Sequence, residues 1–415
     1  MTRTVAIIGA GIVGVSTAIW ALREGLKVIL IDREGPAAGT SFGNGGVLAS
    51  CSVVPVSTPG LLGKAPRMLM DPNQPLFLKW RYLPRLLPYL TRYLRHANAT
   101  DARKRAEAMV PIIGESLADH LALADGTGAE AWIKPSDYLF LYEDRTHYES
   151  DAFGWDTRRD LGFAWDELES QDMRDYDPCF GASIGFAARL RDHGRISDPG
   201  AYVVALAGYA EAQGARIIKA DVDDIVRENG RTTGVRAAGE TIACDAVVVA
   251  TGAWSGPLAA KLGLNVPLET ERGYHIDLWE PSVVPRAPVM VASGKFVITP
   301  MEGRVRLAGV VEFGGLSAPP SRAAFDLLER NVRKAIPGLE WKEQTEWMGH
   351  RPAMADSTPL IGPVPNIPGA YFGFGHDHVG LTGGPKTGRL LSQLIAGKQP
   401  NIDMAPYDPA RFARH

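Results

Sequence analysis

The sequence predicts an α/β fold in which a parallel sheet of the nucleotide-binding type is interrupted by an inserted region of mainly antiparallel strands. Three observations predict it. Residues 5–32 read as strand, glycine loop, helix and strand in succession, a second apolar run at residues 246–250 is followed by a Thr-Gly turn, and several short strand patterns lie between the nucleotide-type segments. With 415 residues the chain is longer than one ordinary hydrophobic core supports, so we expect two domains.

The first glycine loop, residues 9–14, reads Gly-Ala-Gly-Ile-Val-Gly. In a G-x-G-x-x-G loop of this kind, Gly9 permits the tight turn, Gly11 lets the backbone approach a pyrophosphate, and Gly14 lets the following helix press against the strand. The helix N-terminus then offers free N–H groups and the positive end of its dipole to phosphates. Because strand, loop, helix and second strand follow in order, the stretch predicts a dinucleotide site rather than a plain turn.

The second strand of this unit ends in an acid, Asp32. A carboxylate at this place accepts hydrogen bonds from ribose hydroxyls and favours a free 2′-hydroxyl over a 2′-phosphate. The motif therefore predicts FAD or NAD rather than NADP, and by itself it does not choose between the first two.

Composition narrows the class of protein. The net charge of −3 argues against general nucleic-acid binding. The three cysteines, Cys51, Cys179 and Cys244, show no C-x-x-C spacing, so they fit a reducing compartment and predict no metal site. The apolar start of the chain could pass for a secretory leader, but its fixed glycine spacing and following strand argue against one. We expect a cytoplasmic protein, with no segment of about 18 uncharged apolar residues that could span a bilayer.

Further elements follow along the chain. Asp198 and Pro199 predict an N-cap and first turn of a helix that stops at Gly214, and turns at Asn229-Gly230 and Gly239 predict a hairpin-rich strand set. Segments with patterns typical of a nucleotide-binding domain occur at both ends of the chain and in its middle. We therefore expect a discontinuous nucleotide-binding domain of residues 1–75, 192–257 and 345–415. Residues 76–191 and 258–344 are expected to form an inserted substrate domain. Other helices are predicted at residues 80–94, 321–336 and 384–396, and strands at 138–144, 184–190 and 370–374.

Seven segments carry a family resemblance. They are GAGIVG (9–14), TSFGNGG (40–46), RISDPGAY (195–202), VVVATGAWS (247–255), RGYH (272–275), WMGHRP (347–352) and GHDHVGLTGGPKTGRLL (375–391). Together they resemble the D-amino-acid oxidase and dehydrogenase family of FAD flavoproteins, to which glycine oxidase is related, and they cover almost the whole chain. The loop at residues 40–46 with the Pro- and Trp-containing helices after it looks most like bacterial D-amino-acid dehydrogenases. The resemblance implies a Rossmann-like FAD-binding domain of the glutathione-reductase type with an inserted α+β substrate domain of mainly antiparallel sheet.

This resemblance implies FAD rather than NAD. In such proteins the loop at residues 41–46 passes beside the flavin, the Thr-Gly turn at 251–252 lies near the pyrophosphate or ribose, and the loop at 379–382 covers the isoalloxazine. We expect non-covalent FAD, since no cysteine follows Cys244. The residues expected to bind it are Gly9, Gly11, Val13, Gly14, Asp32, Arg33, Ser41, Asn44, Gly45, Gly46, Val222, Thr251, Gly252, Val379, Gly380, Leu381 and Thr382.

Oxidation of an amino acid moves a hydride from Cα to flavin N5, so the protein mainly has to position the substrate. A bidentate arginine holds a carboxylate best, and Arg351 matches the family's carboxylate arginine. The other interpretation of Arg351 is a structural ion pair. Glycine oxidase also uses a tyrosine whose place here is taken by Phe296. We expect Tyr274, or else His275, to supply that contact, and the other interpretation of Tyr274 is that its ring packs in the core.

Two further assignments concern neighbouring residues. We expect Arg272 to be structural. His376 and His378 lie between the glycines of the 375–380 segment, where many relatives have smaller residues, and we take His376 as a candidate for substrate contact. Both histidines could equally be surface loop residues.

The sequence thus predicts an FAD-dependent D-amino-acid dehydrogenase, with proline- and hydroxyproline-like substrates included, that passes electrons to a quinone or other acceptor. The alternative is a glycine- or sarcosine-type amine oxidase that uses O2, and a different class is a flavin-binding sensor without turnover. Residues 64–105 combine many Lys and Arg with Trp, Tyr and Leu. Such a stretch fits peripheral contact with the inner face of a membrane, or a packed helix with a solvated basic face.

Overall fold

The structure, a computed structural model, describes residues 2–61, 63, 71 and 74–413. One six-stranded sheet carries the nucleotide-type elements in the order β18-β19-β12-β1-β2-β8. All neighbours in it are parallel except β18 and β19, which pair antiparallel. Its strands are β1 (Thr4–Ile8), β2 (Lys27–Asp32), β8 (Arg216–Lys219), β12 (Ala246–Val249), β18 (Leu360–Pro363) and β19 (Ala370–Phe374).

Both faces of this sheet are covered, and successive side chains of each strand point alternately into the two cores. Val5 and Ile7 of β1 pack with α1 (Ile12–Arg23), α9 (Pro199–Ala212) and α12 (Gly380–Ile395). Ala6 and Ile8 face the opposite core, beneath α10 (Ser255–Lys261) and a three-stranded sheet. The latter comprises β9 (Val222–Glu228), β10 (Arg231–Ala237) and β11 (Glu240–Ala243), the predicted hairpin set.

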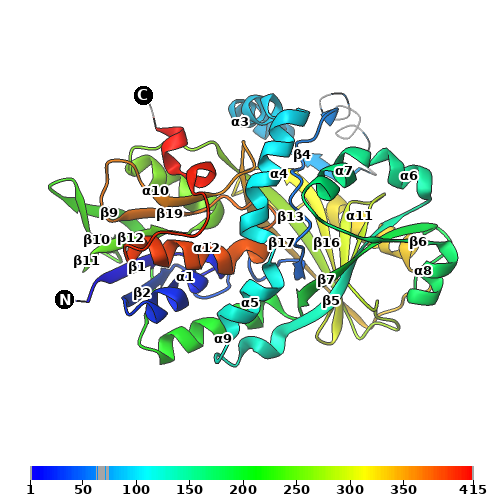
Figure 1. Cartoon of the computed structure of the whole chain (residues 1–415), viewed down its shortest axis with the longest axis horizontal. Coiled ribbons are helices and arrows are strands. Elements are labelled where there is room, and N and C mark those ends of the chain that lie inside the picture. The colour runs from blue at the N-terminus through cyan, green and yellow to red at the C-terminus, as the bar shows by residue number, and fades with distance from the viewer. Residues whose placement is uncertain (1, 62, 64–70, 72–73, 414–415) are drawn as a thin grey trace.

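The second large sheet has ten strands and lies to the right of the nucleotide-type sheets in Figure 1. Its path is β17-β13-β16-β15-β14-β5-β7-β3, with β4 on β16 and β6 on β7, and most neighbours are antiparallel. The strands are β3 (Val47–Leu48), β4 (Leu76–Leu78), β5 (Ile133–Tyr142), β6 (Asp166–Glu169), β7 (Phe186–Ile196), β13 (Leu268–Trp279), β14 (Val289–Val291), β15 (Phe296–Met301), β16 (Arg304–Phe313) and β17 (Glu343–Met354).

The remaining helices flank these sheets, with α4 and α5 running in front of the junction between them (Figure 1). Asp198 caps α9 as predicted, since its Oδ1 accepts from the Ala201 N–H at 2.9 Å. Among the described residues no helix has both the length and the apolar character that crossing a bilayer requires. The other helices are α3 (Leu83–Arg95), α4 (Ala99–Ile113), α5 (Ser116–Ala124), α6 (Arg145–Ser150), α7 (Ala152–Asp160), α8 (Ser170–Tyr176) and α11 (Arg322–Ala335).

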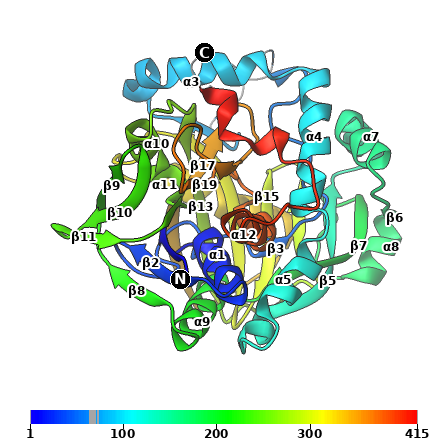
Figure 2. The same ribbon diagram turned by 60° about the vertical axis from the view of Figure 1, so that its left-hand side comes forward.

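The helix near the C-terminus begins earlier than predicted. We expected a loop over residues 379–382 and a helix from 384, whereas α12 begins at Gly380. Its glycines serve packing against α1, which lies beside it in both views (Figures 1 and 2). A Cβ on Gly384 would lie 2.7 Å from Ile12 Cγ1, and one on Gly388 would lie 2.6 Å from the backbone of Ser16. Gly383, just before the expected helix start, packs in the same way, since a Cβ there would lie 2.8 Å from Ile112 Cγ2 of α4.

Two predicted domain boundaries fall inside strands. The boundary at 191/192 lies within β7 and the one at 344/345 within β17, so residues 192–196 and 345–354 run through the ten-stranded sheet. Helices α4 and α5, which we expected in the substrate domain, pack instead on α12, against the nucleotide-type core. The hydrophobic pattern of the sequence predicts the individual strands, but it does not show which sheet each strand joins.

Candidate active site

The glycine loop between β1 and α1 has the backbone that its sequence predicts. Gly9 has a φ of +104°, and a Cβ there would collide with the Ala250 carbonyl. A Cβ on Gly14 would collide with the Gly9 carbonyl, so α1 approaches β1 only without a side chain at that place. Ser41 Oγ accepts from the Ile12 N–H at 2.9 Å and joins the second loop to the start of α1.

Asp32 holds two loops together. One carboxylate oxygen accepts from the Ala10 N–H at 2.9 Å, and the other accepts from the N–H groups of Glu34 and Gly35, each at 2.9 Å. The carboxylate also lines the cavity described next. The structure therefore gives Asp32 a scaffolding role in addition to the ribose contact predicted from the sequence.

A cavity of about 940 Å³ runs from this junction into the space beside the ten-stranded sheet. It brings together almost all residues expected to bind FAD, from six separate chain segments. Gly14 and Gly46 do not line it, because each makes room for neighbouring protein groups instead. The expected residues that line it are Gly9, Gly11, Val13, Asp32, Arg33, Ser41, Asn44, Gly45, Val222, Thr251, Gly252, Val379, Gly380, Leu381 and Thr382.

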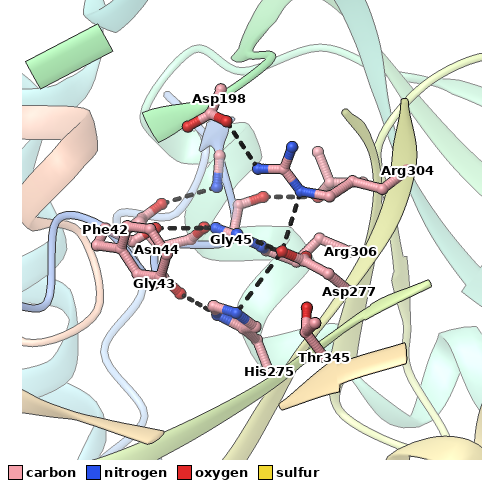
Figure 3. A network of polar contacts seen from close by, with 12 residues as sticks. Phe42, Gly43, Asn44, Gly45, Asp198, His275, Asp277, Arg304, Arg306 and Thr345 are labelled. Carbon is pink, nitrogen blue, oxygen red and sulfur yellow. Dashed lines mark hydrogen bonds and ion pairs between the residues drawn. The ribbon is translucent and has the colours of Figure 1, made fainter. Parts of the chain in front are cut away.

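The loop at residues 42–45 is tied to the ten-stranded sheet through four successive carbonyl groups (Figure 3). Arg306 Nη1 donates to the carbonyls of Phe42 and Asn44 at 3.0 and 2.8 Å. His275 Nδ1 donates to the Gly43 carbonyl at 3.0 Å, and Thr299 Oγ1 donates to the Gly45 carbonyl at 2.7 Å. Arg306 is held in turn by two bonds of 2.7 Å to Asp277. These contacts fix the loop against the cavity.

His275 acts here as a neutral ring. Burial, reinforced by the charge of Arg306, lowers its pKa to about 4. Its Nδ1 must carry the proton because a carbonyl only accepts, and its ring stacks on Trp347 with centroids 5.1 Å apart. Gly43 and Gly349 leave the space that the Trp347 indole fills. This packing of His275 on Trp347 was not predicted from the sequence.

Arg351 lies on β17 and faces the cavity. Its Nη1 donates to the Val310 carbonyl at 2.9 Å, and its Nη2 donates to the Gly309 carbonyl at 3.3 Å. The guanidinium lies over Gly273, where an added Cβ would be 2.5 Å from Nη2. A guanidinium has five N–H donors, so this anchoring leaves three for another acceptor. No ion pair of Arg351 occurs among the described residues, and the purely structural interpretation is not supported.

An irregular strand positions those two carbonyls. The pairing of β13 with β16 shifts register between Arg272 and Tyr274, and Val310 has a φ of +59°. Such a backbone is strained for a β-branched residue, and strain of this kind concentrates at functional sites. Asp377, which also lines the cavity, has a φ of +48°.

Tyr274 does not offer the free hydroxyl that we expected. Its hydroxyl donates to Glu312 Oε2 at 2.5 Å and accepts from the Ser321 N–H at 3.0 Å. Arg272, fully buried, donates to the same Glu312 oxygen at 2.6 Å, as expected for a structural arginine. The hydroxyl hydrogen of Tyr274 is thus already used, although its ring borders the cavity.

The two histidines near α12 differ. His376 is buried, and its Nε2 pairs with Thr387 Oγ1 at 2.9 Å, so one ring nitrogen supports α12. His378 is open to the cavity. The pKa of both is lowered to about 4, at His376 by burial and at His378 by desolvation between the cavity walls together with the charge of Arg351. Both rings are therefore neutral near pH 7. Of the pair, His378 is the more accessible to a ligand.

One acidic residue at this site was missed from the sequence. Glu271 lies on β13 directly opposite Arg351, lines the cavity, and is 8% exposed. Nothing in the sequence singled it out, because charged residues are mostly exposed. Here both faces of β13 are covered, and the acid is buried.

The geometry fits an extended dinucleotide. The lining runs from the N-terminus of α1 past the ends of β2 and β12 to the N-terminus of α12, and the bare backbone of Gly11 lies beside Ser41 Oγ. Two helix N-termini present N–H groups and positive dipole ends to one cavity. The site is therefore that of a dinucleotide-binding protein whose cavity extends from the parallel sheet onto an anchored arginine of the adjoining sheet.

Comparison with known proteins agrees with this class. The sequence profile of the FAD dependent oxidoreductase family matches residues 4–394, and the chain belongs to this family. It is 40% identical to a D-amino-acid oxidase of Bradyrhizobium diazoefficiens and 32% identical to a D-amino acid dehydrogenase of Methylobacterium nodulans, in each case across 99% of both chains. Its fold matches that of the L-proline dehydrogenase of P. horikoshii with a TM-score of 0.76, at 20% identity over 99% of this chain and 98% of the other. The cofactor is FAD.

Proposed function

We propose that this protein is an FAD-dependent dehydrogenase that oxidises D-amino acids, proline-like ones included. The observation that supports this proposal most directly is that the Arg351 guanidinium faces the cavity with three N–H donors unused by protein groups. An amino acid always carries a carboxylate, and a planar guanidinium binds it through two parallel hydrogen bonds. The names of the two relatives support the D configuration.

In this proposal Arg351 binds the substrate carboxylate, and the anchoring carbonyls of Gly309 and Val310 fix the guanidinium before the substrate enters. When bound, FAD supplies the hydride acceptor for the bond at Cα. The N-terminus of α12, at Val379 and Gly380, favours negative charge on a group bound in the cavity. Neutral His378 leaves Arg351 as the cation that the substrate carboxylate meets.

The electron acceptor is proposed to be a quinone or a similar carrier. The alternative is an amine oxidase that uses O2, and the 40% identical relative named an oxidase favours it.

The basic segment at residues 64–105 bears on membrane contact, and part of it, residues 64–70 and 72–73, lies outside the described residues. In the described part, Trp80 and Leu87 are 62% and 47% exposed beside exposed Arg81 and Arg85. Exposed apolar and basic groups together support peripheral binding to an anionic membrane from the cytoplasmic side.

Anaerobic mixing tests the proposal. The FAD-loaded protein is mixed with D-alanine, D-proline, glycine, sarcosine and the L-enantiomers, and the oxidised flavin band is followed. We expect bleaching with D-amino acids. Absence of bleaching with every amine would overturn the enzyme assignment and favour a sensor. Air and a soluble quinone analogue are then compared as oxidants, and rapid recovery in air alone would select the oxidase alternative.

A further inference from the structure

Glu271 is a buried acidic residue that the proposed function has not used. It faces the cavity, and it makes no hydrogen bond or ion pair with another described residue. Its neighbour Glu269, in contrast, is bonded to the Tyr82 hydroxyl and the Thr270 N–H and does not line the cavity. Burying an unpartnered carboxylate is costly unless a ligand compensates it.

The position of Glu271 relative to Arg351 is suited to a molecule with two opposite charges. The two residues are register partners across β13 and β17, so their side chains leave the same face of the sheet with Cβ atoms about 5 Å apart. The Arg351 guanidinium turns away over Gly273 towards β16, and the two charged groups do not form an ion pair with each other. A cation and an anion therefore border the same cavity side by side, each open to it.

We propose that Glu271 accepts a hydrogen bond from a cationic nitrogen of the amino-acid substrate while Arg351 binds its carboxylate. The inference rests on the proposed function and deepens it, because it assigns recognition of both ends of a zwitterion to facing residues of one strand pair. The nitrogen can be the α-ammonium or an ammonium on the side chain, and the chemistry of recognition is the same.

The surroundings of Glu271 favour this role. Burial raises its pKa, Arg351 opposes the rise, and Glu269 adds to it. The other groups that its charge reaches are Tyr89 and Tyr93 of α3 and Asp377 before α12, all of which are acids or phenols. A bound cationic nitrogen would stabilise the ionised form of these acidic groups, whereas a second anion would raise their pKa further.

The test separates binding of the nitrogen from binding of the carboxylate. FAD-loaded wild type, Glu271→Gln, Glu271→Asp and the control Glu269→Gln are titrated with D-alanine, D-lysine and propionate. Binding is followed by calorimetry and flavin absorbance, and anaerobic flavin reduction is measured for the two amino acids. Propionate has a carboxylate but no nitrogen, so it reports on Arg351 alone.

We expect Glu271→Gln to weaken D-alanine binding about ten- to hundredfold, to leave propionate binding unchanged or tighter, and to be partly rescued by aspartate. A loss confined to D-lysine would assign the contact to the side-chain nitrogen and also supports the proposal. Equal losses for D-alanine and propionate, or no loss for either amino acid, would overturn it. If wild type binds D-alanine but no amino acid bleaches the flavin, the proposed function fails while Glu271 is still judged by the binding data.

Discussion

The guanidinium of Arg351 rests on the bare backbone of Gly273, where a Cβ would lie 2.5 Å from Nη2. A glycine inside a covered strand weakens the strand, so its presence here is explained by the arginine that it accommodates. We expect Gly273→Ala to displace the guanidinium and lower kcat/KM for D-alanine at least about tenfold, equivalent to 1.4 kcal/mol. Steady-state kinetics at equal FAD content checks this.

The matched control for that variant is Gly208→Ala in α9. Gly208 has no atom within 4 Å of an added Cβ, and alanine favours the helix by about 0.5–1 kcal/mol. Gly208→Ala should keep full activity with equal or higher stability. If both variants behave alike, the steric explanation for Gly273 is wrong.

Arg351→Ala should lower kcat/KM about a hundredfold or more, because it removes a charge-assisted pair of about 3 kcal/mol. Arg351→Lys keeps the charge but loses the planar fork, so it should recover only part of the activity. Anaerobic flavin-reduction rates against substrate concentration measure both variants. Unchanged KM and rate in Arg351→Ala would remove the arginine from the substrate site.

Tyr274→Phe should affect stability more than catalysis. The hydroxyl bonds to buried Glu312 and to the Ser321 N–H, so its loss leaves both short of a partner and costs about 1–3 kcal/mol. Urea unfolding together with kcat/KM measures the two effects separately. A large rise in KM at unchanged stability would restore the substrate role expected from the sequence.

Acid should destabilise the protein through His120. Its Nε2 donates to the Leu381 carbonyl, its Nδ1 accepts from the Tyr202 hydroxyl, and burial lowers its pKa to about 4. The unfolded value is about 6.5, so the unfolded state takes up the proton first as pH falls. The stabilising contribution is complete above pH 6.5 and is lost between 6.5 and 4, by about 3 kcal/mol.

The variant His120→Gln isolates this contribution. Free energies of unfolding from urea titrations at pH 8 and pH 4.5 are compared with those of the wild type. The stability advantage of wild type over His120→Gln should shrink at the lower pH. An advantage that is the same at both pH values would show that His120 does not titrate in this range.

The sequence predicted the nucleotide-binding elements well because each is local. Strand, glycine loop and Asp32 lie within about thirty residues of one another, and a βαβ unit requires that order. Helices α3, α9 and α11 and strand β19 likewise lie where predicted. The family resemblance assigned Arg351 to the substrate carboxylate, and its open, cavity-facing position agrees with that assignment.

What the sequence did not predict depends on contacts between distant segments. The first turn of α12 was predicted as a loop because its packing partners lie far away in the chain: a Cβ on Gly383 would lie 2.8 Å from Ile112 Cγ2 of α4. Tyr274 looked available because Glu312 and Ser321 are remote in sequence. Glu271 was not singled out because the sequence pattern does not show that both faces of β13 are covered.

The central claim is that one cavity holds FAD and presents Arg351 to the substrate carboxylate. A crystal structure of the FAD complex with propionate tests it most directly. We expect two propionate oxygens about 3 Å from Arg351 nitrogens, with the flavin ring between the N-terminus of α12 and the loop at residues 42–45. Propionate bound elsewhere, or a flavin ring remote from Arg351, would contradict the claim.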